Sequence, residues 1–195
     1  QKIESLVSVL ENFGYHTSFF HGAENGSMGF LGYSNILGID KYFGRNEYNN
    51  DTDFDGYWGI WDEPFLQFMK EKLDEEKEPF FSTVFTISSH EPYIIPEKYK
   101  ETFPEGDIIM HKCVRYTDYA LRRFFDEAKK EHWYNNTLFV LVADHANLIY
   151  YPEYRKALNI NTIPILFYHP DGRYNGLNNL LAQQIDIYPT IVDMI

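Results

Sequence analysis

Apolar side chains recur at helical spacing in several stretches of the chain. Near the start, Ile3, Leu6, Val7 and Leu10 occupy the i, i+3, i+4 and i+7 positions of one face, which predicts an amphipathic helix. The longest pattern of this kind covers residues 108–130. It predicts the longest helix of the chain.

Two further segments also have helical character. We expect a helix from Asp62, as its N-cap, to about Lys77, because a short acidic side chain precedes a periodic apolar pattern. Residues 176–195 predict helical segments that are interrupted near Pro189, since proline disrupts the interior of a helix.

Four short runs are almost continuously apolar or β-branched and predict buried strands. They cover residues 15–20, 80–87, 137–143 and 163–168. Strands that alternate with helices indicate an α/β fold with a mostly parallel central sheet and helices on both faces. The length of the chain, 195 residues, predicts a single domain over residues 1–195.

Three of these strands lead within three residues to a histidine. They lead into His21, His90 and the pair Asp144 and His145. Parallel strands bring their carboxyl ends to one edge of a sheet, where ligands bind in this class of fold. One histidine after a strand is usually an ordinary loop residue. Three such positions, one of them beside an aspartate, favour a site that binds a divalent metal and an anionic ester.

The composition of the chain excludes some classes of binding partner and site. The formal charge of −12 excludes the basic surface expected of a nucleic-acid-binding protein. An acidic enzyme acting on anionic esters needs local neutralisation, which a divalent cation supplies. The only cysteine, Cys113, excludes an intrachain disulfide and a metal site built from cysteines. No apolar run reaches the roughly 18 residues needed to cross a bilayer.

Four motifs resemble those of one known family. Residues 137–145 (TLFVLVADH) look like the strand and Asp-His metal ligands of the sulfatase and lipoteichoic acid synthase family of the alkaline phosphatase superfamily. Residues 184–194 (QIDIYPTIVDM) resemble that family's C-terminal helix start. Residues 88–93 (SSHEPY) and 19–22 (FFHG) resemble its histidine-bearing loops, and the motifs occur in the family's order.

The resemblance implies specific roles for these residues. Asp144 and His145 would be ligands of a divalent metal, with Mn²⁺ expected and Mg²⁺, Ca²⁺ or Zn²⁺ as alternatives. His90 and His21 would bind the substrate, an anionic sulfate or phosphate ester that could be lipid-linked. The fold would be the three-layer sandwich of alkaline phosphatase, incomplete at the N-terminus, because the chain matches the C-terminal portion of the catalytic domain.

Two departures from the family pattern stand out. The family's nucleophile (threonine, or modified cysteine or serine) and its first acidic metal ligand lie upstream of the matching region, so we expect this fragment to lack the nucleophile and to be inactive alone. In addition, the synthases follow His-Gly with a tryptophan and an arginine that hold the substrate. Residues 23–30 contain neither.

By resemblance, the full-length parent is a membrane-anchored enzyme with an extracytoplasmic catalytic domain, attached through N-terminal segments missing here, while the fragment itself is soluble. It would hydrolyse or transfer the ester, with phosphoglycerol or phosphoethanolamine transfer as open alternatives. A different hypothesis is a non-catalytic module that binds an anionic polymer or a partner protein.

Overall fold

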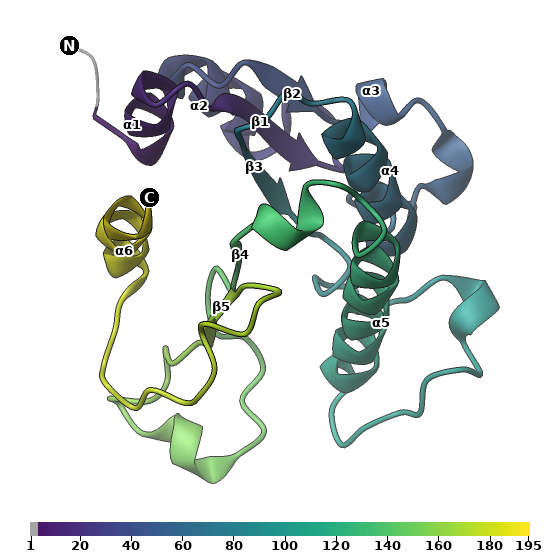
Figure 1. Cartoon of the computed structure of the whole chain (residues 1–195). Coiled ribbons are helices and arrows are strands. Elements are labelled where there is room, and N and C mark those ends of the chain that lie inside the picture. The colour runs from purple at the N-terminus through teal and green to yellow at the C-terminus, as the bar shows by residue number, and fades with distance from the viewer. Residues whose placement is uncertain (1–3) are drawn as a thin grey trace. The chain divides into compact units, whose positions relative to one another are not determined.

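The computed structural model describes residues 4–195, so Ile3 of the first predicted helix lies outside the described residues. The chain divides into two compact units, Gln1–Ala128 and Lys129–Ile195 (Figure 1). Each unit is described by itself below. The assignment of residues 1–195 to a single domain stays a prediction.

A parallel three-stranded sheet forms the centre of the first unit. It consists of β1 (His16–His21), β2 (Lys41–Phe43) and β3 (Phe80–Phe85) in the order β2-β1-β3. All six residues of β1 pair with β3, in register from His16 opposite Phe80 to His21 opposite Phe85. The prediction of a parallel sheet is therefore confirmed for this unit.

Helices cover both faces of this sheet. Side chains alternate between the faces along a strand, so neighbouring residues of β1 contact different helices. Phe20 of β1 stacks on Phe43 of β2 and meets Phe68 of α4 (Asp62–Asp74) edge-on, with ring centroids 4.6 and 6.5 Å away. Phe19 points the other way, toward Phe30 at the start of α2 (Phe30–Leu37), with centroids 5.4 Å apart. The expected layers of helix, sheet and helix are present.

The remaining elements of the first unit support this arrangement. The helix α1 spans Leu6–Asn12 and begins with a capping box, in which the side chains of Ser5 and Ser8 each accept a hydrogen bond from the backbone N–H of the other. The short helix α3 spans Arg45–Tyr48, and α5 spans Met110–Ala128. Single 3-10 turns lie at Ser27–Gly29, Asp51–Asp53 and Glu97–Tyr99.

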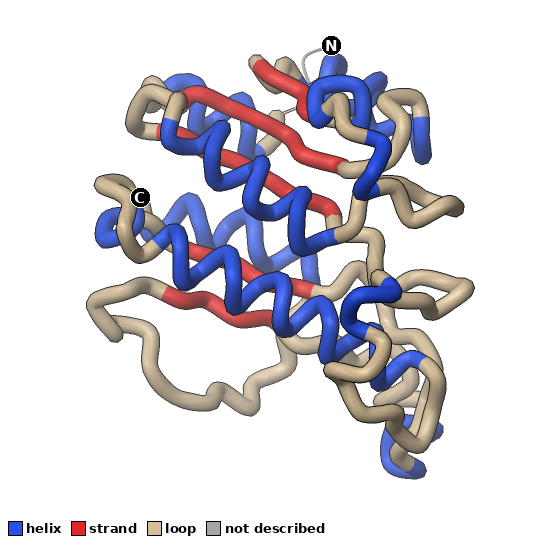
Figure 2. Tube along the Cα trace, turned by 90° about the vertical axis from the view of Figure 1, so that its right-hand side faces the viewer, coloured by secondary structure: helices blue, strands red, loops and turns tan. Residues whose placement is uncertain are grey.

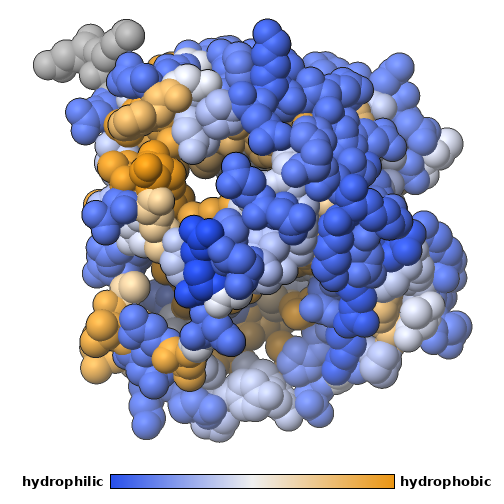
Figure 3. Space-filling view, viewed as in Figure 1, coloured by the Kyte–Doolittle hydropathy of each residue, from blue (hydrophilic) through white to orange (hydrophobic). Residues whose placement is uncertain are grey.

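The helix α5 is strongly amphipathic and packs against α4. Its buried side recurs at three- and four-residue steps through Cys113, Tyr116, Ala120 and Phe124. The surface at the right of Figure 3, which includes the outer sides of these helices, is mostly hydrophilic. The sequence pattern over residues 108–130 thus correctly indicated both the helix and its buried face.

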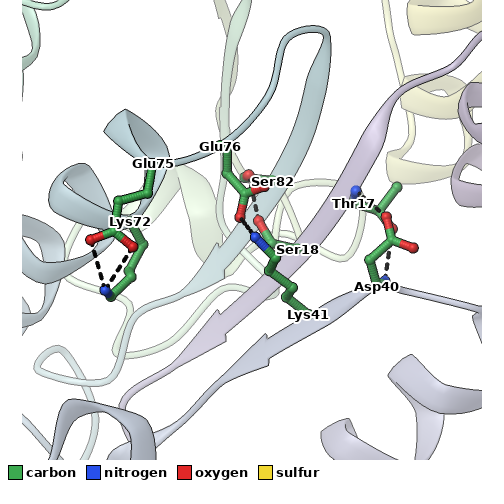
Figure 4. A network of polar contacts seen from close by, with 8 residues as sticks. All are labelled: Thr17, Ser18, Asp40, Lys41, Lys72, Glu75, Glu76 and Ser82. Atoms are coloured by element: carbon green, nitrogen blue, oxygen red, sulfur yellow. Dashed lines mark hydrogen bonds and ion pairs between the residues drawn. The ribbon is translucent and has the colours of Figure 1, made fainter.

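Polar contacts tie the strands to one another and to their surroundings (Figure 4). The carboxylate of Asp40 accepts hydrogen bonds from the backbone N–H of Thr17 at 2.8 Å and from its hydroxyl at 3.2 Å. The hydroxyls of Ser18 and Ser82 lie 2.6 Å apart between β1 and β3. Thr17 and Ser18 are each 2% exposed, so these bonds also satisfy their buried polar atoms.

The second unit contains an antiparallel strand pair and one α-helix. Its strands are β4 (Phe139–Val142) and β5 (Ile165–Tyr168), and α6 spans Ile187–Met194. Figure 2 shows the strands of both units in red and the helices in blue. The unit also has 3-10 turns at Tyr134–Asn136, Pro152–Arg155 and Gln184–Asp186.

Part of the helical prediction for residues 176–195 was wrong. Residues 176–183 form no helix, and Pro189 lies inside α6 rather than interrupting it. Pro189 is the third residue of the helix, where the backbone N–H would have no intrahelical partner, so its absence costs little. None of the helices between residues 4 and 195 is both long and apolar enough to cross a membrane.

We predict that Phe20→Ala destabilises the protein by about 3–5 kcal/mol, because the fully buried ring would leave a cavity between β1 and α4. Urea unfolding measures the change. Phe13→Ala is the matched control: Phe13 is 67% exposed, and its loss should change stability by less than about 0.5 kcal/mol. Equal losses for the two variants would contradict the assignment of the core.

Candidate active site

His90 lies in an aromatic hollow on the surface of the first unit. Its ring packs on the indole of Trp58, with centroids 4.2 Å apart. The indole N–H of Trp58 donates to the backbone carbonyl of Glu91 at 2.6 Å, which fixes the ring beside the histidine. The hollow has a volume of about 530 Å³ and is lined by Tyr57, Trp58, His90, Glu91, Pro92 and Tyr93.

The loop that carries Trp58 is held by one carboxylate. Asp55 Oδ1 accepts hydrogen bonds from the backbone N–H groups of Tyr57, Trp58 and Gly59 at 2.8, 2.8 and 3.0 Å. The N–H of Asp55 donates to the carbonyl of Gly59 at 2.8 Å and closes the turn. Trp58 remains 41% exposed, so a rigid loop presents a large aromatic surface to solvent.

A close backbone approach joins this loop to the end of β1. The N–H of Ile60 donates to the carbonyl of Gly22 at 2.9 Å, and Ala23 forms an antiparallel bridge with Gly59. A side chain at position 59 would collide with the backbone of Gly22 and Ala23, so the approach requires glycine there. The His21-Gly22 turn and the Trp58 loop are therefore parts of one structure.

His21 is the last residue of β1 and is only 2% exposed. Its ring contacts Phe30 and Phe85 edge-on, and its Nδ1 lies 3.1 Å from the Phe85 carbonyl. Because a carbonyl only accepts, Nδ1 carries the proton, and Nε2 is the free nitrogen of the neutral ring. Burial lowers the pKa of His21, although the bond to Phe85 acts in the opposite direction.

Residues 23–30, after His21-Gly22, lack the family's tryptophan and arginine. An arginine of α3, Arg45, lies next to this stretch. Arg45 lies 3.7 Å from Glu24 and donates to Asp51 at 2.8 Å. Its guanidinium also lies 3.8 Å from the centre of the Phe54 ring. Residues 24–26, Arg45, Asn46, Asn49 and Asp51 line a second, more polar hollow of about 530 Å³.

Asp144 and His145 follow β4 in the second unit, and their side chains are close together and exposed. Asp144 Oδ2 lies 3.3 Å from His145 Nε2, at side-chain exposures of 53% and 65%. His145 Nδ1 lies 2.8 Å from the carbonyl of Ala146, so Nδ1 is the donor, and Nε2 is the nitrogen that faces Asp144 Oδ2. A carboxylate oxygen and an imidazole nitrogen thus share one exposed position.

Gln184 fixes the backbone beneath this pair. Its amide nitrogen donates to the carbonyls of Ala143 and Asp144, both at 2.9 Å. The turn that carries Gln184 is held by Asp186, whose side chain accepts from the N–H of Gln183 at 2.7 Å. The QIDIYPT motif therefore supports the strand end that bears Asp144 and His145.

The donor set of this pair suits a divalent metal. Carboxylate and neutral imidazole are ordinary ligands, and an Nδ1–H bonded to a carbonyl is the usual way to orient a ligating histidine. In the part of the chain that the structure describes, however, no group of three or more His, Cys, Asp or Glu side chains is arranged to hold a metal ion. Asp144 and His145 would supply only part of a coordination shell.

The four predicted residues fall into two sets. His21 and His90 belong to the first unit, and Asp144 and His145 belong to the second. Their convergence on one cleft stays a prediction. Sequence reasoning missed Trp58, since no motif marked it. It also placed Asp62 incorrectly: the N-cap of α4 is Trp61, and Asp62 is the first helical residue, with its side chain directed elsewhere.

This α/β fold with a parallel sheet is that of alkaline phosphatase superfamily domains. The family model described as Sulfatase matches residues 1–195. The chain belongs to the sulfatase family.

Relatives place it near the lipoteichoic acid synthases. The chain is 25% identical over 210 residues to lipoteichoic acid synthase 1 of Bacillus subtilis, covering 98% of this chain and 33% of the relative. It spans about a third of the length of the curated full-chain relatives, with coverages of 32–33%.

Solved structures agree on the fold. An alkaline phosphatase superfamily protein from Vibrio parahaemolyticus superposes with a TM-score of 0.73 at 32% identity, covering 88% of this chain and 42% of the other. The lipoteichoic acid synthase LtaP from Listeria monocytogenes superposes with a TM-score of 0.77 at 22% identity, covering 90% and 48%.

We predict that His21 makes stability fall as the pH falls below its unfolded pKa of about 6.5. With its folded pKa lowered, the unfolded state binds more protons in this range, so His21 favours folding above the unfolded pKa, and this contribution is lost as pH falls through the folded value. Urea unfolding between about pH 5 and 8 should show a shallower slope for His21→Gln than for the parent.

Phe13→Ala, an exposed change that removes no titratable group, provides the control and should keep the parental slope. A slope unchanged by His21→Gln would refute the titration of His21.

Proposed function

We propose that this chain is part of the catalytic domain of a metal-dependent enzyme that hydrolyses or transfers a sulfate or phosphate ester, with phosphoglycerol transfer as the leading reaction. The observation that carries the proposal is the convergence of Asp144 Oδ2 and His145 Nε2, 3.3 Å apart on an exposed strand end, within a chain that the sulfatase family covers throughout. Transfer is favoured over hydrolysis by the name of one structural neighbour, the phosphoglycerol transferase GacH of Streptococcus pyogenes.

Asp144 and His145 would hold the divalent ion, with Mn²⁺ as the first candidate and Mg²⁺, Ca²⁺ or Zn²⁺ as alternatives. Bound there, it would supply Lewis-acid polarisation of an ester oxygen. Gln184 would keep the two ligands in place through its bonds to the Ala143 and Asp144 carbonyls.

His90 would contact the oxygens or the leaving group of the ester. Its Nδ1 lies 3.1 Å from the Glu91 carbonyl, which leaves Nε2 for the ligand. Protonated at Nε2, the ring could donate a hydrogen bond to an anionic oxygen. Trp58 would form the wall against which the organic part of the ester rests. His21 would be a second substrate contact through its own Nε2.

The nucleophile and at least one acidic ligand would come from residues outside the present sequence. We further propose that the whole enzyme is anchored in the cell membrane, that its catalytic domain faces outside the cytoplasm, and that its substrate is lipid-linked. Residues 1–195 alone would then be inert, because binding and polarisation cannot replace a covalent step.

In an active enzyme that includes this chain, we predict that Asp144→Ala lowers metal-dependent kcat/KM by more than about 100-fold, since a direct ligand should matter at least as much as an outer-shell partner. Release of phosphate or glycerol phosphate from an aryl or glycerol phosphoester with added Mn²⁺ measures it.

Asp171→Asn is the matched control, because Asp171 also sits beside a histidine, with its Oδ1 2.9 Å from His169 Nδ1, in the same unit. Full activity in Asp144→Ala would reject Asp144 as a metal ligand. No turnover of sulfate and phosphate esters by the parent would favour the non-catalytic module instead.

For residues 1–195 alone, we predict weak binding of Mn²⁺ and Zn²⁺ by calorimetry. Two ligands leave the coordination shell incomplete, whereas catalytic sites of this kind generally have about three protein ligands. Tight stoichiometric binding that disappears in Asp144→Ala would contradict this. It would mean that His21, His90 or His169 completes the shell, and that His21 or His90 is a ligand rather than a substrate contact.

A further inference from the structure

We infer that Asp62 is a positioning residue that holds the His90 loop in its binding geometry. The inference rests on the proposed substrate contact of His90. Asp62 is the first residue of α4 and is only 2% exposed. A buried carboxylate is costly unless donors surround it, so its bonding partners indicate what it is for.

Those partners lie at the start of the segment 87–93, which carries His90. The N–H of Ile87 donates to Asp62 Oδ1 at 2.9 Å, and the N–H of Ser88 approaches both oxygens, at 3.2 and 3.3 Å. In return, the N–H of Asp62 donates to the Ser88 hydroxyl at 3.0 Å. The bonds are reciprocal and fix two consecutive peptides of the segment.

A second connection reaches the residue next to His90. The Thr117 hydroxyl of α5 donates to Asp62 Oδ2 at 3.3 Å. Thr117 has one proton, so the Ser89 hydroxyl, 2.8 Å away, must donate to Thr117. Asp62 therefore sets the direction of a hydrogen-bond chain that joins α4, α5 and the loop.

The constraint passes to His90 through the backbone. The N–H of His90 donates to the carbonyl of Ile87 at 3.2 Å, which closes a turn over the two residues that Asp62 and Thr117 hold. On the far side of His90, the Trp58 indole holds the carbonyl of Glu91. The backbone is therefore held by hydrogen bonds on both sides of the exposed His90 ring.

Helix capping does not account for this arrangement. The backbone N–H groups that Asp62 binds belong to residues 87 and 88, not to the first turn of α4, and the N-cap residue Trp61 makes no side-chain cap bond. Burial raises the pKa of Asp62, while the N–H groups of Ile87 and Ser88 lower it. An exposed serine or aspartate would begin the helix at smaller cost. The buried carboxylate serves the loop.

The test is Asp62→Asn, which keeps the shape but turns an N–H₂ group toward the N–H of Ser88 or the hydroxyl of Thr117. In an active enzyme that includes residues 1–195, kcat/KM for glycerol phosphoester should fall about 10- to 100-fold, as for partners that orient a ligand-binding group. In the chain of residues 1–195, the indole N–H resonance of Trp58, assigned with Trp58→Phe, should shift as its bond to Glu91 loosens.

Asp40→Asn is the matched control for stability. Asp40 also accepts a backbone N–H and a hydroxyl, both from Thr17, but it does not touch the His90 loop. It should lower stability without either effect. Thr117→Ser should retain activity, and Thr117→Val should lose part of it, which gives a milder variant if Asp62→Asn folds poorly.

A double-mutant cycle separates positioning from a general structural role. In the His90→Ala background, Asp62→Asn should add little further loss. An equal loss in both backgrounds, or parental kcat/KM and an unmoved Trp58 resonance in Asp62→Asn and Thr117→Val, would overturn the inference. Full activity in His90→Ala would instead reject the proposed function of His90, and the Trp58 resonance alone would then decide whether Asp62 orients the loop.

Discussion

The arrangement of the first unit depends on the register in which β1 pairs with β3. The register from His16–Phe80 to His21–Phe85 brings His21 level with the last residue of β3, from which the His90 loop departs. The same register sets the alternation that gives Phe20 to one helical layer and Phe19 to the other. A shift by one residue would place His21 on the opposite face and bury it against α4. The position of His21 beside the start of the His90 loop follows from that pairing.

One contact recurs at three candidate histidines. His21, His90 and His145 each place Nδ1 beside a backbone carbonyl, at 3.1, 3.1 and 2.8 Å. Each carbonyl fixes the tautomer of the neutral ring and leaves Nε2 as the nitrogen that can act on a ligand. The three histidines differ in how far their side chains are exposed. His21 is buried among aromatic rings, whereas His90 and His145 are exposed, so the same tautomer serves different surroundings.

Sequence patterns predicted the parts of the structure that depend on local periodicity. The strands β1, β3, β4 and β5, the amphipathic α5 and the position of histidines after strands were visible because burial imposes a period on the side chains, whereas the short strand β2 was not predicted. Other features could not be predicted in this way. An apolar run does not encode its direction in a sheet, so the antiparallel pairing of β4 with β5 was not foreseen. Asp62 had the local signature of an N-cap, yet its partners lie at residues 87 and 88.

The charged side chains of the first unit limit how this unit could bind an anion. Arg45 is paired with Asp51 and Glu24, and Arg115 donates to the carbonyls of Pro104 and Glu105. Lys98 contacts Glu63, and Lys112 contacts Glu105. These cations are already neutralised or held by the protein itself, and the chain as a whole carries −12. An anionic ester would therefore depend on imidazole N–H donors and on a bound divalent ion for compensation. Under the proposed function, this requirement accounts for histidine-bearing loops and an Asp-His pair in place of an arginine cluster.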